Sequence, residues 1–483
     1  MPHASRCASA AAIALLVGCA STQTASTGLS NGEDGIAAKA RAIHERVMAL
    51  DTHVDIEPAN FQVDGLNYAQ RLNTQVDLTK MEAGGLDAIF FSIYVGQGAL
   101  DSAGFARAYA TDTAKFNAVH RLAEVIAPSR IAIAYTADDA RRIYASGRKV
   151  AFMGVENGYG LDSDIRRVKE FYDRGARYMS LAHNGNNQLS DSNTGEATNS
   201  WLWGDGLSPL GKQVIGEMNR LGIMIDISHP SKGSMMQALK LSRAPIIASH
   251  SGVRAICNVT RNLDDEQLKA IAANGGVVQM VAFRSYVKCD PRAAEARANA
   301  LAALAAEFHV EPQGTGGGAN FPVTFGARGG NPPRNGGAGG RGPTAGTPGS
   351  SCNAIVDRGQ SQPVAVPTDL KPAAVEEYRR RVFAINQNFP PPTTATVKDF
   401  VDHIDYGVKL MGIDHVGISS DFDGGGGLDG YNCALDAINV TTELVRRGYT
   451  EEQIAKIWSG NLLRVLGEVE QVAKKIQSGA LEP

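Results

Sequence analysis

Eight short apolar runs, rich in β-branched residues, alternate along the chain with longer stretches whose apolar residues recur at helical spacing. Apolar runs without polar alternation are typical of parallel strands buried on both faces. The predicted strands span residues 47–56, 86–95, 150–156, 176–183, 222–229, 244–250, 276–283 and 415–421. The predicted helices include residues 105–125, 165–174, 209–221, 231–241, 264–274 and 396–411, and two more within 450–475. The repeated strand–helix pattern predicts an α/β fold.

Eight such units favour a closed (β/α)8 TIM barrel over an open doubly wound sheet. The open sheet would call for a glycine-rich phosphate turn after the first strand, and residues 55–58 (Asp-Ile-Glu-Pro) do not form one. A barrel takes about 250 residues and tolerates long insertions. The 483 residues of this chain therefore accommodate one barrel with an insert.

The insert is predicted between the seventh and eighth strands, over residues 287–395. Within it, residues 314–349 contain 14 Gly and 5 Pro among 36 residues. A segment so poor in apolar side chains cannot bury a core, so we predict that it is disordered. Helices are predicted on either side, at residues 291–308 and 372–386. Because the insert follows a strand end, it either covers the mouth of the barrel or is a neutral surface insertion.

The N-terminus is typical of an export signal. Arg6 precedes an apolar run, residues 10–18, which is too short to span a bilayer. The run ends at Cys19 in a sequence that resembles the bacterial lipoprotein signal, which implies removal of residues 1–18 and a lipid on Cys19. The alternative is an ordinary cleaved signal with a chance cysteine. Residues 19–36 are small and polar, as in a flexible tether, and 37–483 form the barrel domain.

By the same resemblance, Ala20 favours an outer-membrane location, so we expect a lipid-anchored protein on the periplasmic face of the bacterial envelope. The net charge is −3 with 20% charged residues. Nothing in the sequence suggests the basic patch that nucleic-acid binding needs. Four cysteines remain beyond the signal, and none shows CxxC spacing. In an oxidising compartment they favour one or two disulfides over a thiolate metal site.

Metal-ligand residue types follow several predicted strands, where the active face of such a barrel lies. His53 and Asp55 are two apart on the first strand, so their side chains share a face. Glu156 follows an apolar strand, where an unpaired carboxylate would be costly but two metal ions could share its oxygens. His229 and His250 end consecutive strands. We predict two zinc ions, one held by His53, Asp55 and Glu156, the other by Glu156, His229 and His250.

Three further residues complete the expected chemistry, in which a water shared by the ions is deprotonated and attacks an amide. Asp421 is our choice for moving the proton to the leaving nitrogen, with Asp423 as its competitor. His183 follows the fourth strand and could donate to the oxyanion, or it could be structural. Arg261 could hold a substrate carboxylate in bidentate fashion, although a surface role is the ordinary expectation for an arginine.

These motifs, in this order and spacing, resemble the membrane (renal) dipeptidase family. The segments that carry the resemblance are residues 51–55 (Asp-Thr-His-Val-Asp), 154–157 (Gly-Val-Glu-Asn), 181–184 (Leu-Ala-His-Asn), 206–211, 226–229 (Asp-Ile-Ser-His), 249–251, 261–262, 415–424 and 461–465. The resemblance runs from about residue 40 to 475 outside the insert, and it implies an amidohydrolase-type barrel with two zinc ions that hydrolyses dipeptides.

The resemblance also carries residue roles. It matches the five predicted ligands to zinc ligands, Asp421 to the acid/base aspartate, and His183 and Arg261 to substrate-binding residues. It implies a disulfide between Cys257 and Cys289, which leaves Cys352 and Cys433 for a second bridge, and it implies a homodimer. The alternatives left open are a metal-dependent deacylase of N-acyl amino acids on the same barrel and a non-catalytic binding lipoprotein.

Overall fold

The computed structural model describes residues 26–289, 291–308, 352, 372–388 and 394–482. Its centre is a sheet of parallel strands in the order β1-β2-β4-β5-β6-β7-β8-β9. The bounds are β1 Leu50–Asp55, β2 Ala88–Tyr94, β4 Lys149–Glu156, β5 Ala176–Ser180, β6 Met224–Asp226, β7 Ile247–Ser251, β8 Val277–Val281 and β9 Val416–Ser419. Beyond β9, the backbone N–H of Asp55 donates to the carbonyl of Phe422 at 2.9 Å. The eight strands therefore form a nearly closed (β/α)8 barrel, as predicted.

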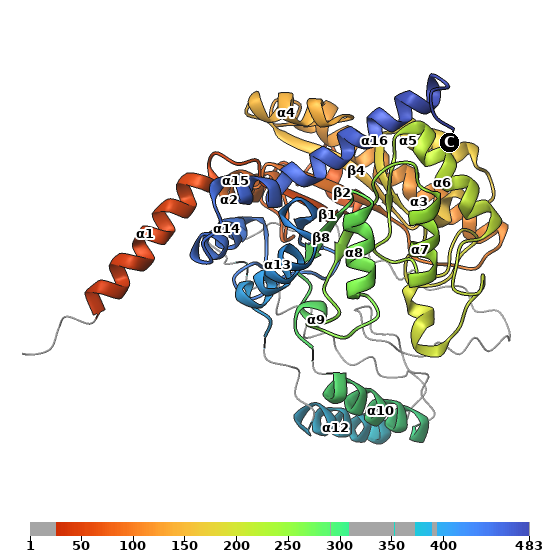
Figure 1. Ribbon diagram of the computed structural model, residues 1–483. Coiled ribbons are helices and arrows are strands. Elements are labelled where there is room, and N and C mark those ends of the chain that lie inside the picture. The colour runs from red at the N-terminus through yellow and green to blue at the C-terminus, as the bar shows by residue number, and fades with distance from the viewer. Residues whose placement is uncertain (1–25, 290, 309–351, 353–371, 389–393, 483) are drawn as a thin grey trace, which may run out of the picture.

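Helices surround the barrel on its outside (Figure 1). Their bounds are α1 Ser26–His44, α2 Leu78–Gly84, α3 Ser102–Arg121, α4 Ala137–Ala145, α5 Arg166–Asp173, α6 Pro209–Leu221, α7 Lys232–Leu241, α8 Asp265–Ala273, α9 Arg284–Val287, α10 Pro291–Glu307, α12 Pro372–Asn388, α13 Val397–Met411, α14 Ala437–Arg446, α15 Glu451–Ala455 and α16 Asn461–Gln477. Local signals set several ends. For example, the Ser208 side chain accepts from the N–H of Gly211 and Pro209 opens α6.

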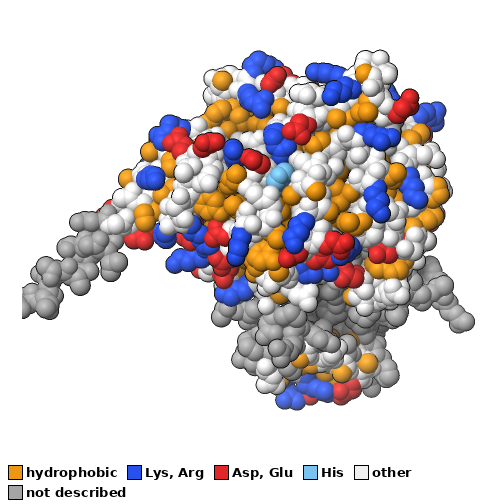
Figure 2. Space-filling model, viewed as in Figure 1, with side chains coloured by type: hydrophobic (Ala, Val, Ile, Leu, Met, Phe, Trp, Pro, Cys, Tyr) orange, Lys and Arg blue, Asp and Glu red, His pale blue; other side chains and the backbone are white. Residues whose placement is uncertain are grey.

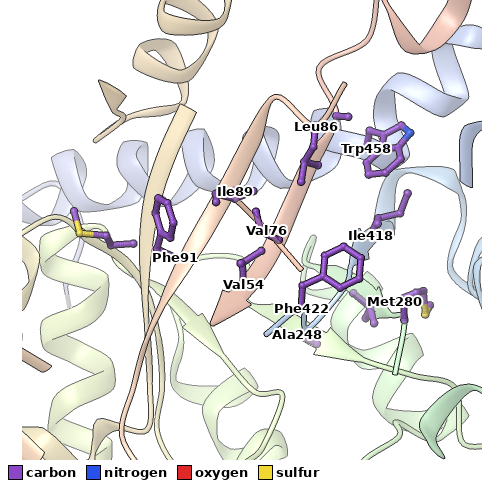
Figure 3. Close-up of a cluster of buried hydrophobic side chains, with 14 of the residues drawn as sticks. Val54, Val76, Leu86, Ile89, Phe91, Ala248, Met280, Ile418, Phe422 and Trp458 are labelled. Atoms are coloured by element: carbon purple, nitrogen blue, oxygen red, sulfur yellow. The ribbon is translucent and has the colours of Figure 1, made fainter. Parts of the chain in front are cut away.

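The core fills the space between strands and helices, and part of it is drawn in Figure 3. There Val54, Phe91 and Ile418 come from three different strands, and Trp458 comes from the segment before α16. All four side chains are fully buried. Each such side chain contributes about 1.5–3 kcal/mol of hydrophobic free energy, so the strands are held by burial on both faces, as their continuous apolar pattern predicted.

Most strands are shorter than the apolar runs that predicted them, whereas β4 begins one residue before its predicted run, at Lys149. β6, for example, ends at Asp226 rather than at His229, because the chain turns there: the N–H of Ser228 donates to the Asp226 carboxylate at 3.1 Å. One strand was missed. β3 (Ile131–Ile133) pairs with β4 outside the barrel order, and its three residues are too short a run to stand out in the sequence.

The structure differs from the flexible tether predicted over residues 19–36. Helix α1 begins at Ser26, and it lies against α14. Glu33 forms an ion pair with Arg446 at 2.7 Å, and Ile36 and Ala40 pack against the main core. Within the predicted tether, residues 32–35 are exposed and Ile36 is half-buried, so the Glu33 ion pair and the Ile36 contact are what attach this part of the helix to the rest of the chain. Residues 1–25, including the predicted signal and Cys19, lie outside the described residues.

The two helices predicted within the insert are present as α10 and α12. They lie side by side beneath the barrel in Figure 1, with Leu304, Tyr378 and Val382 buried between them and an ion pair between Arg381 and Glu307. The glycine-rich residues 314–349 lie outside the described residues, so their predicted disorder stays a prediction.

Two disulfides are present. Cys257 pairs with Cys289, with Cα atoms 5.4 Å apart, as the family resemblance implied. Cys352 pairs with Cys433, with Cα atoms 5.7 Å apart, and this bridge ties the insert to the loop after β9. Within the described part of the chain, no helix is both long and apolar enough to cross a membrane. Basic and acidic side chains are mixed over the face shown in Figure 2.

Candidate active site

The predicted site residues meet at the carboxyl ends of the barrel strands. His53 and Asp55 lie in β1, Glu156 ends β4, and His250 lies in β7. The other three follow their strands: His183 comes after β5, His229 after β6 and Asp421 after β9. Their potential ligand atoms fall into three overlapping groups whose members lie within 4.8 Å of one another: His53–Glu156–His250, Glu156–His183–His229 and His53–Asp55–Asp421.

Glu156 is the centre of this arrangement, and its two carboxylate oxygens face different partners. Oε2 lies 3.2 Å from Nε2 of His53, which is itself 3.5 Å from Oδ2 of Asp55. Oε1 lies 3.0 Å from Nε2 of His229 and 3.3 Å from Nε2 of His250. The carboxylate is therefore divided between two sets of side chains, as a carboxylate shared by two metal ions would be.

The hydrogen bonds around His53 and His250 determine which ring nitrogen carries the proton. The Tyr178 hydroxyl donates to the Thr52 carbonyl at 3.2 Å, so it accepts from Nδ1 of His53 at 2.8 Å. Likewise the Ser249 hydroxyl donates to Asp226 at 2.7 Å and accepts from Nδ1 of His250 at 2.8 Å. With Nδ1 protonated, the neutral ring has its lone pair on Nε2, the atom that faces Glu156.

A hydrogen bond fixes the tautomer of His229 in the same way. Its Nδ1 lies 3.3 Å from the side-chain oxygen of Asn184, to which it donates. Its Nε2 lies only 3.0 Å from Nε2 of His250. Two nitrogen lone pairs at this separation repel each other unless a cation or a proton lies between them. Outer partners that fix the tautomer in this way are a regular feature of metal-binding histidines.

The donor set fits a divalent metal such as zinc. A tetrahedral zinc ion with ligands at about 2.0–2.1 Å keeps those ligands about 3.3 Å apart. The separations around Glu156 and His53 run from 3.0 to 3.5 Å. In addition, Nε2 of His53 is buried without a geometrically acceptable hydrogen-bond partner among the described residues. The residues present are therefore suited to hold a metal ion on each side of the Glu156 carboxylate.

The electrostatics of Glu156, His229 and His250 agree with this fit. His53 differs, because Tyr178 and Glu156 outweigh the effect of burial and raise its pKa well above the usual value. Burial by itself would raise the pKa of Glu156, but His53 and His183 outweigh it and hold that pKa well below its usual value. Burial lowers the pKa of His229 and His250 well below the ordinary range. An ionised carboxylate and two neutral imidazoles result, and these are the protonation states in which such side chains bind metals.

Asp421 and Asp423 were competing candidates for the proton carrier, and the structure places them differently. The Asp421 carboxylate lies in the group with His53 and Asp55, and burial, helped by Asp55, raises its pKa well above the usual value. The Asp423 carboxylate instead accepts the backbone N–H groups of Gln75 and Val76, at 2.7 and 3.2 Å. Only Asp421 of the two therefore faces the metal-ligand group.

His183 lies directly beside two of the predicted metal ligands, Glu156 and His229. Its Nε2 is 3.7 Å from Oε1 of Glu156, and its ring centroid is 4.2 Å from that of His229. Its side chain is 15% exposed, more than those of the neighbouring histidines. It thus stands at the open side of the group, where a substrate would enter.

Arg261 is buried, so the surface role that its residue type suggested is wrong. Its Nη1 donates to the carbonyl of Ser228 and, at 3.0 Å, to the hydroxyl of Ser251. Its Nη2 lies 3.0 Å from Nε2 of His229. Its Nε has no hydrogen-bond partner among the described residues. The guanidinium therefore lies beside the ligand group with a buried donor still to be satisfied.

Sequence reasoning missed the residues that hold the ligands. Tyr178 lies in the middle of β5, within an apolar run, so nothing in the sequence except its hydroxyl group pointed to a role. Asp226 is part of the family motif at residues 226–229, but it was assigned no role. Tyr94 ends β2 with its ring centroid 4.7 Å from that of His183. Its position at a strand end could have identified it, by the same rule that identified the histidines.

Comparison with known proteins finds relatives over most of the chain. A model of the membrane dipeptidase family (peptidase family M19) matches residues 37–480. Dipeptidase tcpJ of Claviceps purpurea (strain 20.1) is 27% identical over 428 residues, which cover 87% of this chain and 76% of that protein. The crystal structure of the probable dipeptidase PvdM from Pseudomonas aeruginosa is 30% identical with a TM-score of 0.68, and the match covers 91% of this chain and 100% of that one.

A more distant structure shares the fold. The metallo peptidase from Rhodobacter sphaeroides, solved with a phosphinate mimic of the dipeptide L-Ala-D-Ala, is 20% identical with a TM-score of 0.58. That match covers 88% of this chain and 99% of the other. Together with the family model over residues 37–480, these likenesses lead to one conclusion: the chain belongs to the membrane dipeptidase family and is a metal-dependent dipeptidase.

Proposed function

We propose that this chain is a di-zinc dipeptidase that hydrolyses the peptide bond of free dipeptides. The observation that carries the proposal is the division of the Glu156 carboxylate, with Oε2 on the His53 side and Oε1 on the side of His229 and His250. In this proposal His53, Asp55 and Glu156 hold one zinc ion, and Glu156, His229 and His250 hold the other. When bound, the ions supply Lewis-acid polarisation and acidify a water molecule.

Asp421 moves the proton in this proposal. It accepts one proton of the attacking water and delivers it to the leaving amine nitrogen, so that the broken peptide bond yields a neutral amine and a carboxylic acid, whose remaining proton, the second one of the water, is then released to solvent. A raised pKa suits a group that must both accept and release a proton near neutral pH, and the pKa of Asp421 is raised. Its position beside His53 and Asp55 brings it to the atoms that react.

Arg261 and His183 bind the substrate in this proposal. The Nε of Arg261, which has no hydrogen-bond partner in the described part of the chain, can donate to the C-terminal carboxylate of a dipeptide as a charge-assisted hydrogen bond. His183, at the open side of the group, donates to the carbonyl oxygen as negative charge develops on it. The dipeptide mimic in the Rhodobacter sphaeroides structure supports a dipeptide as the substrate class.

Hydrolysis assays on protein beginning at Ser26 test the proposal. The protein is assayed as purified, after chelation, and after zinc is restored, with L,L and L,D dipeptides and one N-acetyl amino acid. We expect zinc-dependent cleavage of the dipeptides and two zinc ions per chain by elemental analysis. Cleavage of the acylated amino acid alone would replace the proposal with a deacylase. A folded, zinc-loaded protein that cleaves nothing would support a non-catalytic binding protein.

We also propose that the full-length chain is lipidated on Cys19, lies in the bacterial envelope and forms a homodimer. The support for the lipid is the apolar run that ends at Cys19. Membrane fractionation of wild type and Cys19→Ala tests it, because the variant should leave the membrane fraction. Sedimentation equilibrium of the protein beginning at Ser26 tests the dimer, and a monomer mass at micromolar concentration would contradict it.

A further inference from the structure

The loop after β9, residues 421–433, has a backbone that needs support. Asp421 and Asp423 both have left-handed φ angles, 57° and 62°, and Gly425 and Gly427 also have positive φ. Left-handed backbone at residues other than glycine is unfavourable and persists only where the surroundings enforce it. The residues that support this conformation at Asp421 lie in the segment around Gln75.

Gln75 makes three side-chain hydrogen bonds to this loop. Its Nε2 donates to the carbonyls of Gly426 and Asn432, at 2.9 and 2.8 Å. Its Oε1 accepts from the N–H of Asp423 at 2.8 Å. The side chain is almost completely buried. One amide group thus satisfies three backbone groups from three separate positions in the loop.

The contact is reciprocal. The Asp423 carboxylate accepts the backbone N–H groups of Gln75 and Val76, and the carbonyl of Gln75 accepts from the N–H of Ala434 at 3.1 Å. The loop and the Gln75 segment therefore form a closed ring of hydrogen bonds, which we call the Gln75 clasp (residues 75–76, 423, 426, 432 and 434).

The Gln75 segment is itself firmly anchored. The buried ammonium of Lys80 donates to the carbonyls of Leu72 and Thr74, at 2.8 and 2.6 Å, and to the carboxylate of Asp77. Asp77 in turn accepts from the N–H of Leu72 at 3.0 Å. Gln75 lies between Leu72 and Asp77, so these hydrogen bonds also fix the position of its backbone relative to the loop.

The clasp reaches Asp421 through Gly426. The N–H of Gly426 donates to the Asp421 carbonyl at 2.8 Å, while Gln75 holds the carbonyl of the same residue. A side chain at Gly426 would overlap the carbonyl of Ser420, and one at Gly424 would overlap the carboxylates of Asp55 and Asp421. The loop therefore packs directly beneath the Asp421 side chain.

We propose that Gln75 is a positioning residue, which acts through the loop to keep the Asp421 carboxylate aimed at the metal-ligand group. The proposal rests on the proposed function, because it takes Asp421 as the proton carrier. Gln75 does not touch the reacting atoms; it determines where Asp421 lies. A misplacement of about 1 Å can cost about a hundredfold in rate, so the clasp has a direct effect on turnover.

The test compares Gln75→Glu, Asp421→Asn and the double variant. Gln75→Glu keeps the size of the side chain but, when ionised, replaces the donor that serves two carbonyls with an acceptor. We expect kcat to fall at least about tenfold, with bound zinc unchanged. If Gln75 acts through Asp421, the double variant is about as active as Asp421→Asn alone, because effects of residues that act as a unit are not additive. A double variant that shows the full product of both losses overturns the proposal.

Amide hydrogen exchange gives a second readout that does not depend on activity. Exchange in residues 421–430 should be at least about tenfold faster in Gln75→Glu than in wild type, since the loop loses part of its support. Gln62→Glu is the matched control, because the Gln62 side chain is exposed and, among the described residues, its one hydrogen bond is to the nearby carbonyl of Pro58. If Gln75→Glu does not fold, Gln75→Met replaces it, with equal length and no hydrogen bonds. Unchanged exchange in the loop overturns the proposal.

These readouts separate the two ideas. Wild-type protein that hydrolyses no dipeptide contradicts the proposed function, and the exchange experiment still decides whether Gln75 holds the loop. Active wild-type protein with a Gln75→Glu variant of equal kcat and equal exchange contradicts the positioning role alone.

Discussion

The hydroxyl of Tyr178 determines the tautomer of His53, so Tyr178→Phe tests whether this hydrogen bond contributes to the zinc affinity of the site. In the wild type this hydroxyl accepts from Nδ1 of His53 at 2.8 Å and donates to the Thr52 carbonyl. The ring stacks on Phe90 with centroids 5.1 Å apart. Phenylalanine keeps that packing, so the variant removes the hydrogen bonds and little else.

The magnitude follows from the burial of the two groups. Nδ1–H of His53 would be left without a partner inside the barrel, and an unsatisfied buried polar group costs about 1–3 kcal/mol. Loss of outer partners of metal-binding histidines typically lowers metal affinity about 10–100-fold, or about 1.4–2.7 kcal/mol. The two ranges overlap, so we expect the zinc affinity of Tyr178→Phe to fall about 10–100-fold.

Competition with a chromogenic chelator measures this affinity directly. The matched control is Tyr109→Phe, which removes a hydroxyl that donates to Glu170 at 2.6 Å on the outside of the barrel. The control should bind zinc like the wild type. If Tyr178→Phe also binds zinc with wild-type affinity, then Tyr178 does not orient His53 for a metal, and the argument from tautomers fails.

Three other predictions follow. Asp421→Asn should retain zinc while kcat falls about 10²–10⁴-fold, the usual contribution of a positioned acid/base group; steady-state kinetics with a KM near that of the wild type would support it, and an unchanged kcat would exclude the role. Replacing Cys257 and Cys289 together by alanine opens a bridge of sequence separation 32, which should lower the free energy of unfolding by about 3–4 kcal/mol; an unchanged urea midpoint would contradict this. Asp112 is buried in α3 without a hydrogen-bond partner among the described residues, and burial raises its pKa well above the usual value. The folded state therefore keeps a proton that the unfolded chain releases, and the free energy of unfolding falls as pH rises from the unfolded pKa of Asp112 towards its folded pKa. Asp112→Asn should thus raise Tm more at about pH 8 than at about pH 5. An equal effect at both pH values would refute the reasoning.

Much of the fold was predictable because it depends on local pattern. Uninterrupted apolar runs marked the strands of the barrel, and apolar residues at helical spacing marked helices such as α6, whose predicted and observed bounds agree. The failures have local causes as well. β3 is three residues long, and helix α1 extends into the predicted tether because Glu33 and Ile36 find partners elsewhere in the chain.

The sequence predicted which residues lie together in the candidate site, but not how they are arranged. The rule that chemistry gathers at the carboxyl ends of barrel strands selected His53, Glu156, His229 and His250. Asp421 was chosen over Asp423, but Asp423 stayed open as its competitor, because two residues at the same strand end have the same pattern. The backbone groups of Gln75 and Val76, almost 350 residues earlier, decide between them.

The sequence by itself determined the fold class and the residue types of the candidate site. Both depend on short stretches of sequence: the uninterrupted apolar runs of the strands and the polar residues at their ends. Only the tertiary structure decided which oxygen of Glu156 faces which histidine, which nitrogen of His53 is protonated, and that Arg261 is buried. Those properties depend on hydrogen bonds between residues far apart in the chain, and such bonds exist only once the barrel has closed.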